Sequence, residues 1–193
     1  YIFYSKLDEN HRPKKIFRHE LGTSSEKDTL IFCEKTDAFT VSISLSSDEK
    51  YYFISSSDHN TSEQYYFDVN EKSPVPKLIQ KRDKGVLYSV NSWDGYFYMH
   101  TNKNAEDFKI DRTKNTNLDK WETFIPAKNE TLIGNITFLK NWIIRSEVTN
   151  ALGKLFVRNL ITDIEEELIF TEEEVYDGGI SLIQKDRDTD YIY

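Results

Sequence analysis

Short runs that alternate apolar and polar residues recur along the chain and predict β-strands rather than helices. The stretch from Phe39 to Arg82 shows this most fully, with FTVSISLS, YYFISSSD, SEQYYFDV and PKLIQKR following one another. β-Branched and aromatic residues dominate each run. Ser, Asp, Asn, Glu or Pro separates one run from the next, as between strands joined by tight turns. The stretch therefore predicts one unit of four strands.

This four-strand unit is repeated before and after the stretch. Units begin near Phe39, Val86, Leu132 and Val175, at spacings of 47, 46 and 43 residues. Repeats of about 40–50 residues with four strands each are typical of β-propeller blades. A many-stranded β-sandwich would also explain the strands, but it does not explain the spacing. The favoured fold is therefore all-β, built from propeller blades.

The predicted architecture is a partial β-propeller over residues 1–193, with about three complete blades and two partial ones. Residues 1–35 form the end of one blade, residues 39–82, 86–127 and 132–172 form whole blades, and residues 175–193 begin another. The middle strands of each unit are the most apolar, and the outer strands carry more charge. Asp94-Gly95 predicts a hairpin. Residues 63–69 and 117–121 could form one turn of helix each, although neither keeps a helical period.

Composition narrows the classes of function. A net charge of −8 and a pI of about 5.1 argue against nucleic acid, whose binding requires Lys and Arg to neutralise phosphates. No apolar run approaches the roughly 20 residues that span a bilayer. Cys33 is the only cysteine, so no internal disulfide can form, and a reducing, cytoplasmic setting is expected. The chain starts in mid-strand without an initiator Met, as expected of a piece of a longer protein.

The sequence lacks the local motifs that are typical of catalysis or metal binding. A nucleophile elbow needs Gly-x-Ser-x-Gly, and residues 179–181 (GIS) lack its second glycine and any following helix. The DRDTD run at 186–190 begins like a calcium loop but lacks the later Gly and Glu. Four histidines are scattered without zinc-site spacing: His11, His19, His59 and His100. The sequence thus predicts no catalytic, cofactor-binding or metal-binding residue.

Two further patterns have more than one interpretation. Trp93, Trp121 and Trp142 occupy comparable positions in successive units, where they either stack on a ligand or pack between blades. The acidic runs at 165–167 and 172–174 either attract a cation or basic peptide, or form a solvated edge that blocks strand pairing.

Several segments resemble oligopeptidase B (protease II) enzymes of the prolyl oligopeptidase family. YSKLDENHRPKKIFRHELGT, from Tyr4 to Thr23, is similar to their L-D-E-x-x-R-P core followed by R-H-x-L-G-T. SSSDHNTSEQYYFDV resembles their polar Thr-Ser-Glu hairpin. YFYMHTNKNAEDFKI resembles their T-N-x-x-A-x-N-F run, with Asp107 in place of Asn. WETFIPAKNETLI, KLFVRNLITDIEEELIF and DTDYIY follow in the family's order. The resemblance covers essentially the whole chain.

This resemblance implies a serine peptidase that cleaves short peptides after Arg or Lys. In that family a seven-bladed propeller caps an α/β-hydrolase domain and excludes large, folded substrates. The catalytic triad and most specificity residues belong to the hydrolase domain, so no position here is assigned a catalytic role. The expected role of these blades is control of access, without hydrolytic activity of their own. The expected partners are a C-terminal hydrolase domain and short basic peptides.

Other functions and arrangements remain open. An independent propeller would bind peptides or proteins at its rim, and a secreted lectin would use its tryptophans and glycosylation sequons such as Asn60-Thr61-Ser62. A downstream Gly-x-Ser-x-Gly would favour the peptidase, and a stop codon soon after Tyr193 would favour the binding module. The blades form either an open arc or a small four-bladed ring. An open arc would expose apolar faces and strand edges, so self-association is expected.

Overall fold

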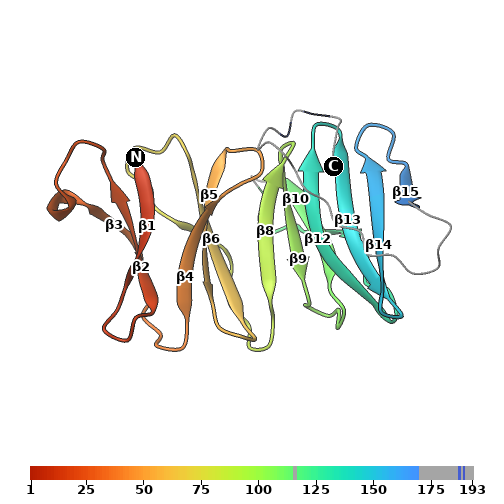
Figure 1. Ribbon diagram of the computed structural model, residues 1–193, viewed down its shortest axis with the longest axis horizontal. Coiled ribbons are helices and arrows are strands. Elements are labelled where there is room, and N and C mark those ends of the chain that lie inside the picture. The colour runs from red at the N-terminus through yellow and green to blue at the C-terminus, as the bar shows by residue number, and fades with distance from the viewer. Residues whose placement is uncertain (115–116, 170–186, 188, 190–193) are drawn as a thin grey trace. The chain divides into compact units, whose positions relative to one another are not determined.

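A computed structural model describes residues 1–114, 117–169, 187 and 189 of this chain (Figure 1). These residues form antiparallel β-sheets, and the helical structure among them is a three-residue 3-10 turn, Ser25–Lys27. The chain divides into two compact units: Tyr1–Met99 with Thr113–Lys120, and His100–Arg112 with Trp121–Tyr193. In the described ranges, no helix has the length and apolarity needed to cross a membrane. The all-β prediction is confirmed.

In the described ranges, fifteen strands form four sheets, each built from strands that follow one another in the chain. The first sheet has the order β1-β2-β3, with strands Ile2–Leu7, Pro13–His19 and Thr29–Cys33. The second has the order β4-β5-β6-β7, with strands Thr40–Leu45, Tyr51–Ser57, Ser62–Asp68 and Lys77–Gln80. The third has the order β11-β10-β9-β8, with strands Glu122–Ile125, Lys109–Lys114, Tyr96–Thr101 and Tyr88–Trp93. The fourth has the order β12-β13-β14-β15, with strands Thr131–Leu139, Trp142–Thr149, Leu152–Asn159 and Glu165–Leu168.

Each sheet is a meander in which consecutive strands pair, because the link between them turns the chain back on itself. The turn between β8 and β9 shows the cause locally. Asp94 and Gly95 have φ values of 47° and 77°, the left-handed conformation that a two-residue hairpin requires and that Gly adopts without strain. The hairpin predicted at this dipeptide is confirmed.

Burial follows the predicted difference between middle and outer strands. In β5 and β6, Phe53, Ile54 and Phe67 are almost completely buried, whereas the outer strand β7 exposes Leu78. The helical turn considered for residues 63–69 is wrong, because most of this stretch lies in β6. Phe67 points into the core there and pairs with Tyr52 of β5.

Aromatic side chains fill the space on both faces of the second sheet. Toward the first sheet, Phe3 packs on Tyr52 and Phe67, with ring centroids 4.5 and 5.5 Å apart. On the opposite face, Tyr51 and Phe97 of β9 meet edge-on at 5.1 Å. Rings of this size bury much apolar area and favour tilted or edge-on contacts. They therefore contribute to the apolar packing that holds the sheets of the first unit together.

In the second unit, the fourth sheet depends on a close approach between β12 and β13. Pairing shifts register between Ile133 and Ile136, and Gly134 lies within this irregularity. A Cβ at position 134 would lie 2.2 Å from Ser146 Oγ and 2.9 Å from Ser146 O, so a residue without a side chain is needed here. Ile133 and Phe138 on either side are completely buried.

Candidate functional site

A buried charge cluster lies where the first and second sheets meet, at the start of β4. We refer to Glu34, Glu63 and Arg82 as the Arg82 cluster. Arg82 Nη2 lies 2.7 Å from Glu34 Oε2 and 3.0 Å from Glu63 Oε1. The two glutamates are only 8% and 5% exposed. Charges this deeply buried persist only when they are paired and hydrogen-bonded.

Hydrogen bonds complete the environment of Glu34. Ser56 Oγ donates to its Oε2 at 2.5 Å, and the Thr36 backbone N–H donates to its Oε1 at 2.7 Å. Burial acts to raise the pKa of Glu34, but the bonds from Ser56, Arg82 and Thr36 outweigh burial and hold that pKa at about 2. This carboxylate is therefore ionised at neutral pH and fully engaged.

Glu63 is held in a similar way. Tyr65 Oη donates to its Oε1 at 2.6 Å, and the backbone N–H of Arg82 donates to its Oε2 at 2.8 Å. Burial favours the neutral acid, but the Arg82 and Tyr65 hydrogen bonds lower the pKa of Glu63 overall. Burial, together with the Glu63 carboxylate, raises the pKa of Tyr65 to about 12. These shifts keep the Glu63 carboxylate ionised and the Tyr65 hydroxyl protonated near pH 7.

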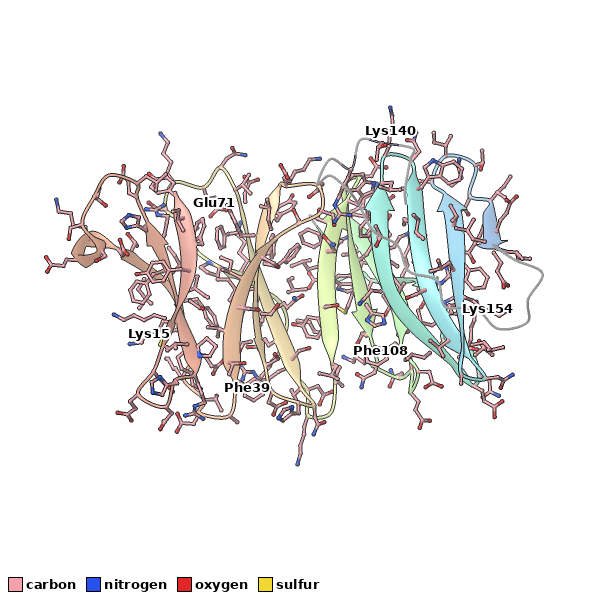
Figure 2. All side chains as sticks on the ribbon, in the orientation of Figure 1. Lys15, Phe39, Glu71, Phe108, Lys140 and Lys154 are labelled. Carbon is pink, nitrogen blue, oxygen red and sulfur yellow. The ribbon has the colours of Figure 1, made fainter. Side chains whose placement is uncertain are left out.

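The backbone that joins β3 to β4 is clamped around this cluster. Lys14 Nζ donates to Thr36 O at 2.5 Å and to Phe39 O at 2.6 Å. The guanidinium of Arg82 lies over the Phe39 ring, 4.1 Å from its centroid. Figure 2 shows Phe39 at the end of the second sheet where β4 begins. The cluster thus fixes the connection between the two sheets, and its chemistry is that of a structural clamp.

A second charge cluster lies within the fourth sheet. Arg145 is 1% exposed, and its guanidinium lies 2.7 Å from both Glu147 Oε1 and Glu165 Oε2. Lys128 Nζ approaches Glu147 Oε1 at 2.7 Å, and Arg145 stacks on Phe156 at 4.8 Å. The Arg145 hydrogen bonds lower the pKa of Glu165 despite its partial burial. This cluster likewise pairs its charges internally.

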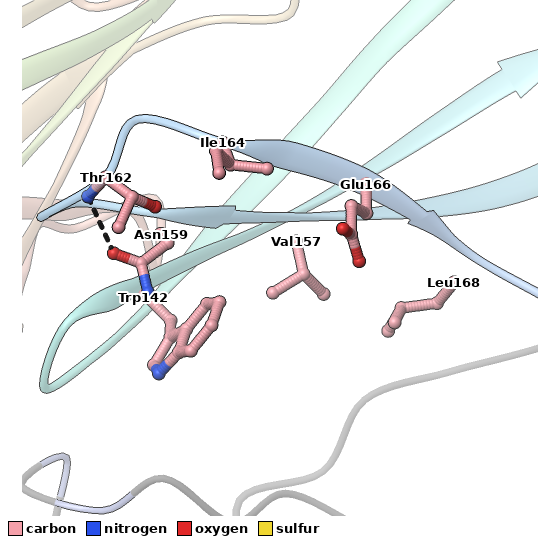
Figure 3. Close-up of a pocket in the computed structure, with 7 residues that line it drawn as sticks. All are labelled: Trp142, Val157, Asn159, Thr162, Ile164, Glu166 and Leu168. Carbon is pink, nitrogen blue, oxygen red and sulfur yellow. Dashed lines mark hydrogen bonds between the residues drawn. The ribbon is translucent and has the colours of Figure 1, made fainter.

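A cavity of about 390 Å³ opens on the other face of the fourth sheet (Figure 3). Its described lining comes from β13, β14, β15 and the turn before β15: Trp142, Val157, Asn159, Thr162, Ile164, Glu166 and Leu168. Asn159 Oδ1 accepts from the Thr162 backbone N–H at 3.0 Å, so the amide is engaged in shaping the turn. Among these lining residues Glu166 alone is ionisable, and a single carboxylate without a nucleophile or base partner supplies no hydrolytic chemistry.

The histidines do not come together. His19 Nδ1 lies 2.7 Å from Asp28 Oδ1. The other carboxylate oxygen of Asp28 accepts a hydrogen bond from Tyr4 Oη at 2.7 Å. His100 Nε2 lies 2.7 Å from Ile133 O, and burial lowers the pKa of His100. His11 and His59 lie in turns. In the described ranges no group of three His, Cys, Asp or Glu could hold a metal ion.

The three tryptophans each have a defined place in the fold. Trp142 lines the cavity, Trp93 ends β8 and Trp121 immediately precedes β11. Residues 179–181 and the Asp residues of the 186–190 run lie outside the described residues. Sequence reasoning missed the Arg82 cluster. Its one signal was an Arg in the polar link after β7, two residues beyond the last strand residue, Gln80.

Comparison with known proteins gives one consistent family. The model of "Prolyl oligopeptidase, N-terminal beta-propeller domain" matches residues 1–193. Protease 2 of Moraxella lacunata is 30% identical over 192 residues, which cover 100% of this chain and 27% of that protein. The human prolyl endopeptidase-like protein is 28% identical over 143 residues, 72% of this chain and 19% of its own length. The chain therefore spans roughly a fifth to a quarter of these relatives.

Solved structures show the same fold. Oligopeptidase B from Trypanosoma brucei, in a closed form with covalently bound antipain, superposes with a TM-score of 0.90 at 24% identity. The match covers 98% of this chain and 28% of that one. Oligopeptidase B from Leishmania major gives a TM-score of 0.81 at 18% identity, covering 88% of this chain and 25% of that one. The predicted propeller fold is confirmed.

Proposed function

The chain belongs to the prolyl oligopeptidase family and corresponds to its N-terminal β-propeller domain, and from this premise we propose that it is the substrate-gating part of a serine oligopeptidase that hydrolyses short peptides after Arg or Lys. The observation that carries the proposal is the match of the propeller model over all 193 residues. The 30% identity to a protease 2 supports the oligopeptidase B branch of this family as the choice.

Control of access fits the construction of these sheets. A gate must keep its opening narrow, so its blades must resist separation. The Arg82 cluster and the Phe3, Tyr52 and Phe67 rings join the first sheet to the second through buried ion pairs and apolar packing. A rigid ring over a deep site admits flexible peptides and shelters the reaction from bulk water.

The partners follow from this role. We propose that a C-terminal α/β-hydrolase domain of the same polypeptide supplies the nucleophile, base and oxyanion donors, because no described residue of this chain is placed to do so. Short basic peptides are the substrates, the setting is cytoplasmic, and nucleic acid is excluded by the acidic balance of −8. In isolation, copies of this 193-residue chain associate with one another through their free strand edges.

The residue preferred before the cleaved bond distinguishes an Arg- or Lys-specific oligopeptidase from a Pro-specific member of the family. The full-length protein would be assayed with fluorogenic peptides that differ only in Arg, Lys or Pro before the cleaved bond. We expect kcat/KM for Arg and Lys to exceed that for Pro by at least about a hundredfold, because a site that pairs a cation rejects a residue without one. A preference for Pro would refute the assignment. The 193 residues alone serve as the control and should show no turnover.

A further inference from the structure

A contact between two segments of the second compact unit centres on Ile133 of β12. His100 Nε2 lies 2.7 Å from Ile133 O, and the Ile133 backbone N–H donates to Asp107 O at 2.9 Å. His100 belongs to β9 of the third sheet, and Asp107 lies in the turn that follows β9. Both backbone groups of Ile133 are therefore bonded outside its own sheet. We call His100, Asp107, Phe108 and Ile133 the Ile133 clasp (Figure 2 labels Phe108).

The clasp requires one protonation state of the His100 imidazole. A carbonyl oxygen only accepts hydrogen bonds, so Nε2 carries the hydrogen, and in the neutral ring Nδ1 carries none. The ring is half-buried and stacks on Phe108, with centroids 4.5 Å apart and planes inclined by 13°. Phe108 has a φ of 65°, which a bulky residue rarely adopts, so the turn holds this ring in place against backbone strain. A second proton, on Nδ1, would place a charge in this confined site.

The elements around His100 offer little to compensate such a charge. β8, β9 and β12 contain no Asp, Glu, Lys or Arg. The charged residues of the turn and of β10, which pairs with β9, are Lys103, Glu106, Asp107, Lys109, Asp111, Arg112 and Lys114. Of these, Lys109 pairs with Asp111, and Asp107 takes part in the clasp through its backbone oxygen. Burial lowers the pKa of His100, although the Ile133 carbonyl acts to raise it.

The other contacts between sheets respond differently to pH. The Arg82 cluster joins the first sheet to the second through charges that persist near neutral pH, since the pKa of Glu34 is about 2. His19 bonds Asp28 in the link before β3, and His11 and His59 lie in turns. His100 therefore combines a side chain that titrates near pH 5 to 8 with a bond to the backbone of another sheet.

We propose that the Ile133 clasp is an acid-sensitive latch between His100 and β12, which opens when His100 takes up a second proton. The imidazolium needs water at Nδ1, so the ring leaves Phe108 and releases Ile133 O. A free imidazole binds the proton more tightly than the clasped one. The clasp is therefore complete above about pH 6.5 and is lost as pH falls through the lowered pKa of His100. Its consequence for access rests on the proposed function: acid loosens the gate at this contact.

Hydrogen exchange of β12 in the full-length protein tests this latch. Mass spectrometry would follow the peptide that covers Thr131–Leu139 at about pH 7.5 and about pH 5, with rates corrected for the intrinsic effect of pH. We expect the protection of this peptide to fall at least about tenfold at the lower pH. His100→Gln should remove the response, because a glutamine amide donates to Ile133 O without titrating. His19→Gln is the matched control, since it removes another imidazole and should keep the response.

Nuclear magnetic resonance of the same protein with nitrogen-15 histidine follows the ring directly. The His100 signals, identified by their loss in His100→Gln, should show the Nε2–H tautomer and titrate below about pH 6.5.

Three results would overturn the proposal. The first is unchanged protection of β12 in the native protein at the lower pH, and the second is an equal loss in His100→Gln. The third is a His100 pKa at or above about 6.5, as attraction of the imidazolium to the Phe108 face would produce. This last result needs only the native protein and remains decisive should His100→Gln fail to fold, because His100 can then be identified by elimination with the other three histidine variants. Neither measurement depends on peptide specificity, so a preference for Pro would refute the proposed function and leave the latch standing.

Discussion

At the scale of single residues, Arg82 makes the contact that several elements share. One nitrogen, Nη2, approaches carboxylates from the end of β3 and the start of β6, while the guanidinium covers Phe39 before β4. Without it, Glu34 and Glu63 would face each other as two buried charges of the same sign. A buried carboxylate that loses its partner is far more costly than the intact pair is stabilising.

Arg82→Ala should therefore lower the free energy of unfolding by about 3 kcal/mol, the lower end of the range for breaking a buried ion pair. Urea unfolding followed by tyrosine and tryptophan fluorescence measures it. Lys77→Ala is the matched control in the same sheet, because the Lys77–Glu71 pair is exposed and separated by 3.6 Å. That variant should lose less than about 1 kcal/mol. Equal losses of stability in the two variants would contradict the stabilising role of the Arg82 cluster.

The pH dependence of stability follows from Glu34. Its pKa is about 2 in the folded chain against a usual value of 4.5, so the unfolded chain binds the proton more tightly. The stability that Glu34 provides is complete above about pH 4.5 and is lost as pH falls toward 2. Thermal melts across this range should show a steeper loss of Tm in the native chain than in Glu34→Gln. Parallel profiles would show that this carboxylate is not held in its ionised form.

These contacts could not have been predicted from the sequence. Glu34 and Arg82 are 48 residues apart and lie in links without periodic pattern, where charged residues are usually solvated. Only the stacking of one sheet on another brings them together. The absence of a nucleophile elbow and of a zinc pattern could be read from residue spacing, since both motifs are local. Cys33, at the end of β3, is exposed.

At the scale of elements, strand alternation was a good guide because side chains on opposite faces of a strand meet different environments. Asp94-Gly95 located its hairpin for a similar reason, since the dipeptide itself sets the turn. The stretch at 63–69 misled because Glu63 and Gln64 are polar. In the structure both are buried: Glu63 pairs with Arg82, and the Val90 backbone N–H donates to Gln64 Oε1 at 2.6 Å.

Gly134 provides a test of packing within an element. Its Cβ would clash with both the side chain and the carbonyl oxygen of Ser146, so Gly134→Ala should destabilise the fourth sheet by about 1–3 kcal/mol, as overpacking does. Gly153→Ala is the control, because no atom lies within 4 Å of its added Cβ and its φ is not in the left-handed region. Denaturant unfolding should separate the two. A neutral Gly134→Ala would show that β12 and β13 approach less closely.

At the scale of the whole molecule, the repeat of four strands every 43–47 residues was the informative signal. It predicted an all-β propeller because each unit hides its apolar faces only against neighbouring units. The family model and the TM-score of 0.90 confirm that fold. The blade boundaries at residues 35, 82, 127 and 172 stay predictions. Function could not follow from the repeat, because the same fold serves many chemistries and these residues contain none of the catalytic motifs.

The proposed function requires that this propeller belongs to a serine hydrolase. The most direct test is fluorophosphonate labelling of the native protein in a lysate of its source, detected with an antibody against these 193 residues. A labelled band far heavier than 22.8 kDa is expected, because the proposed reactive serine would lie in another domain of the same polypeptide. An unlabelled band near 22.8 kDa would contradict it and identify a free-standing binding module instead.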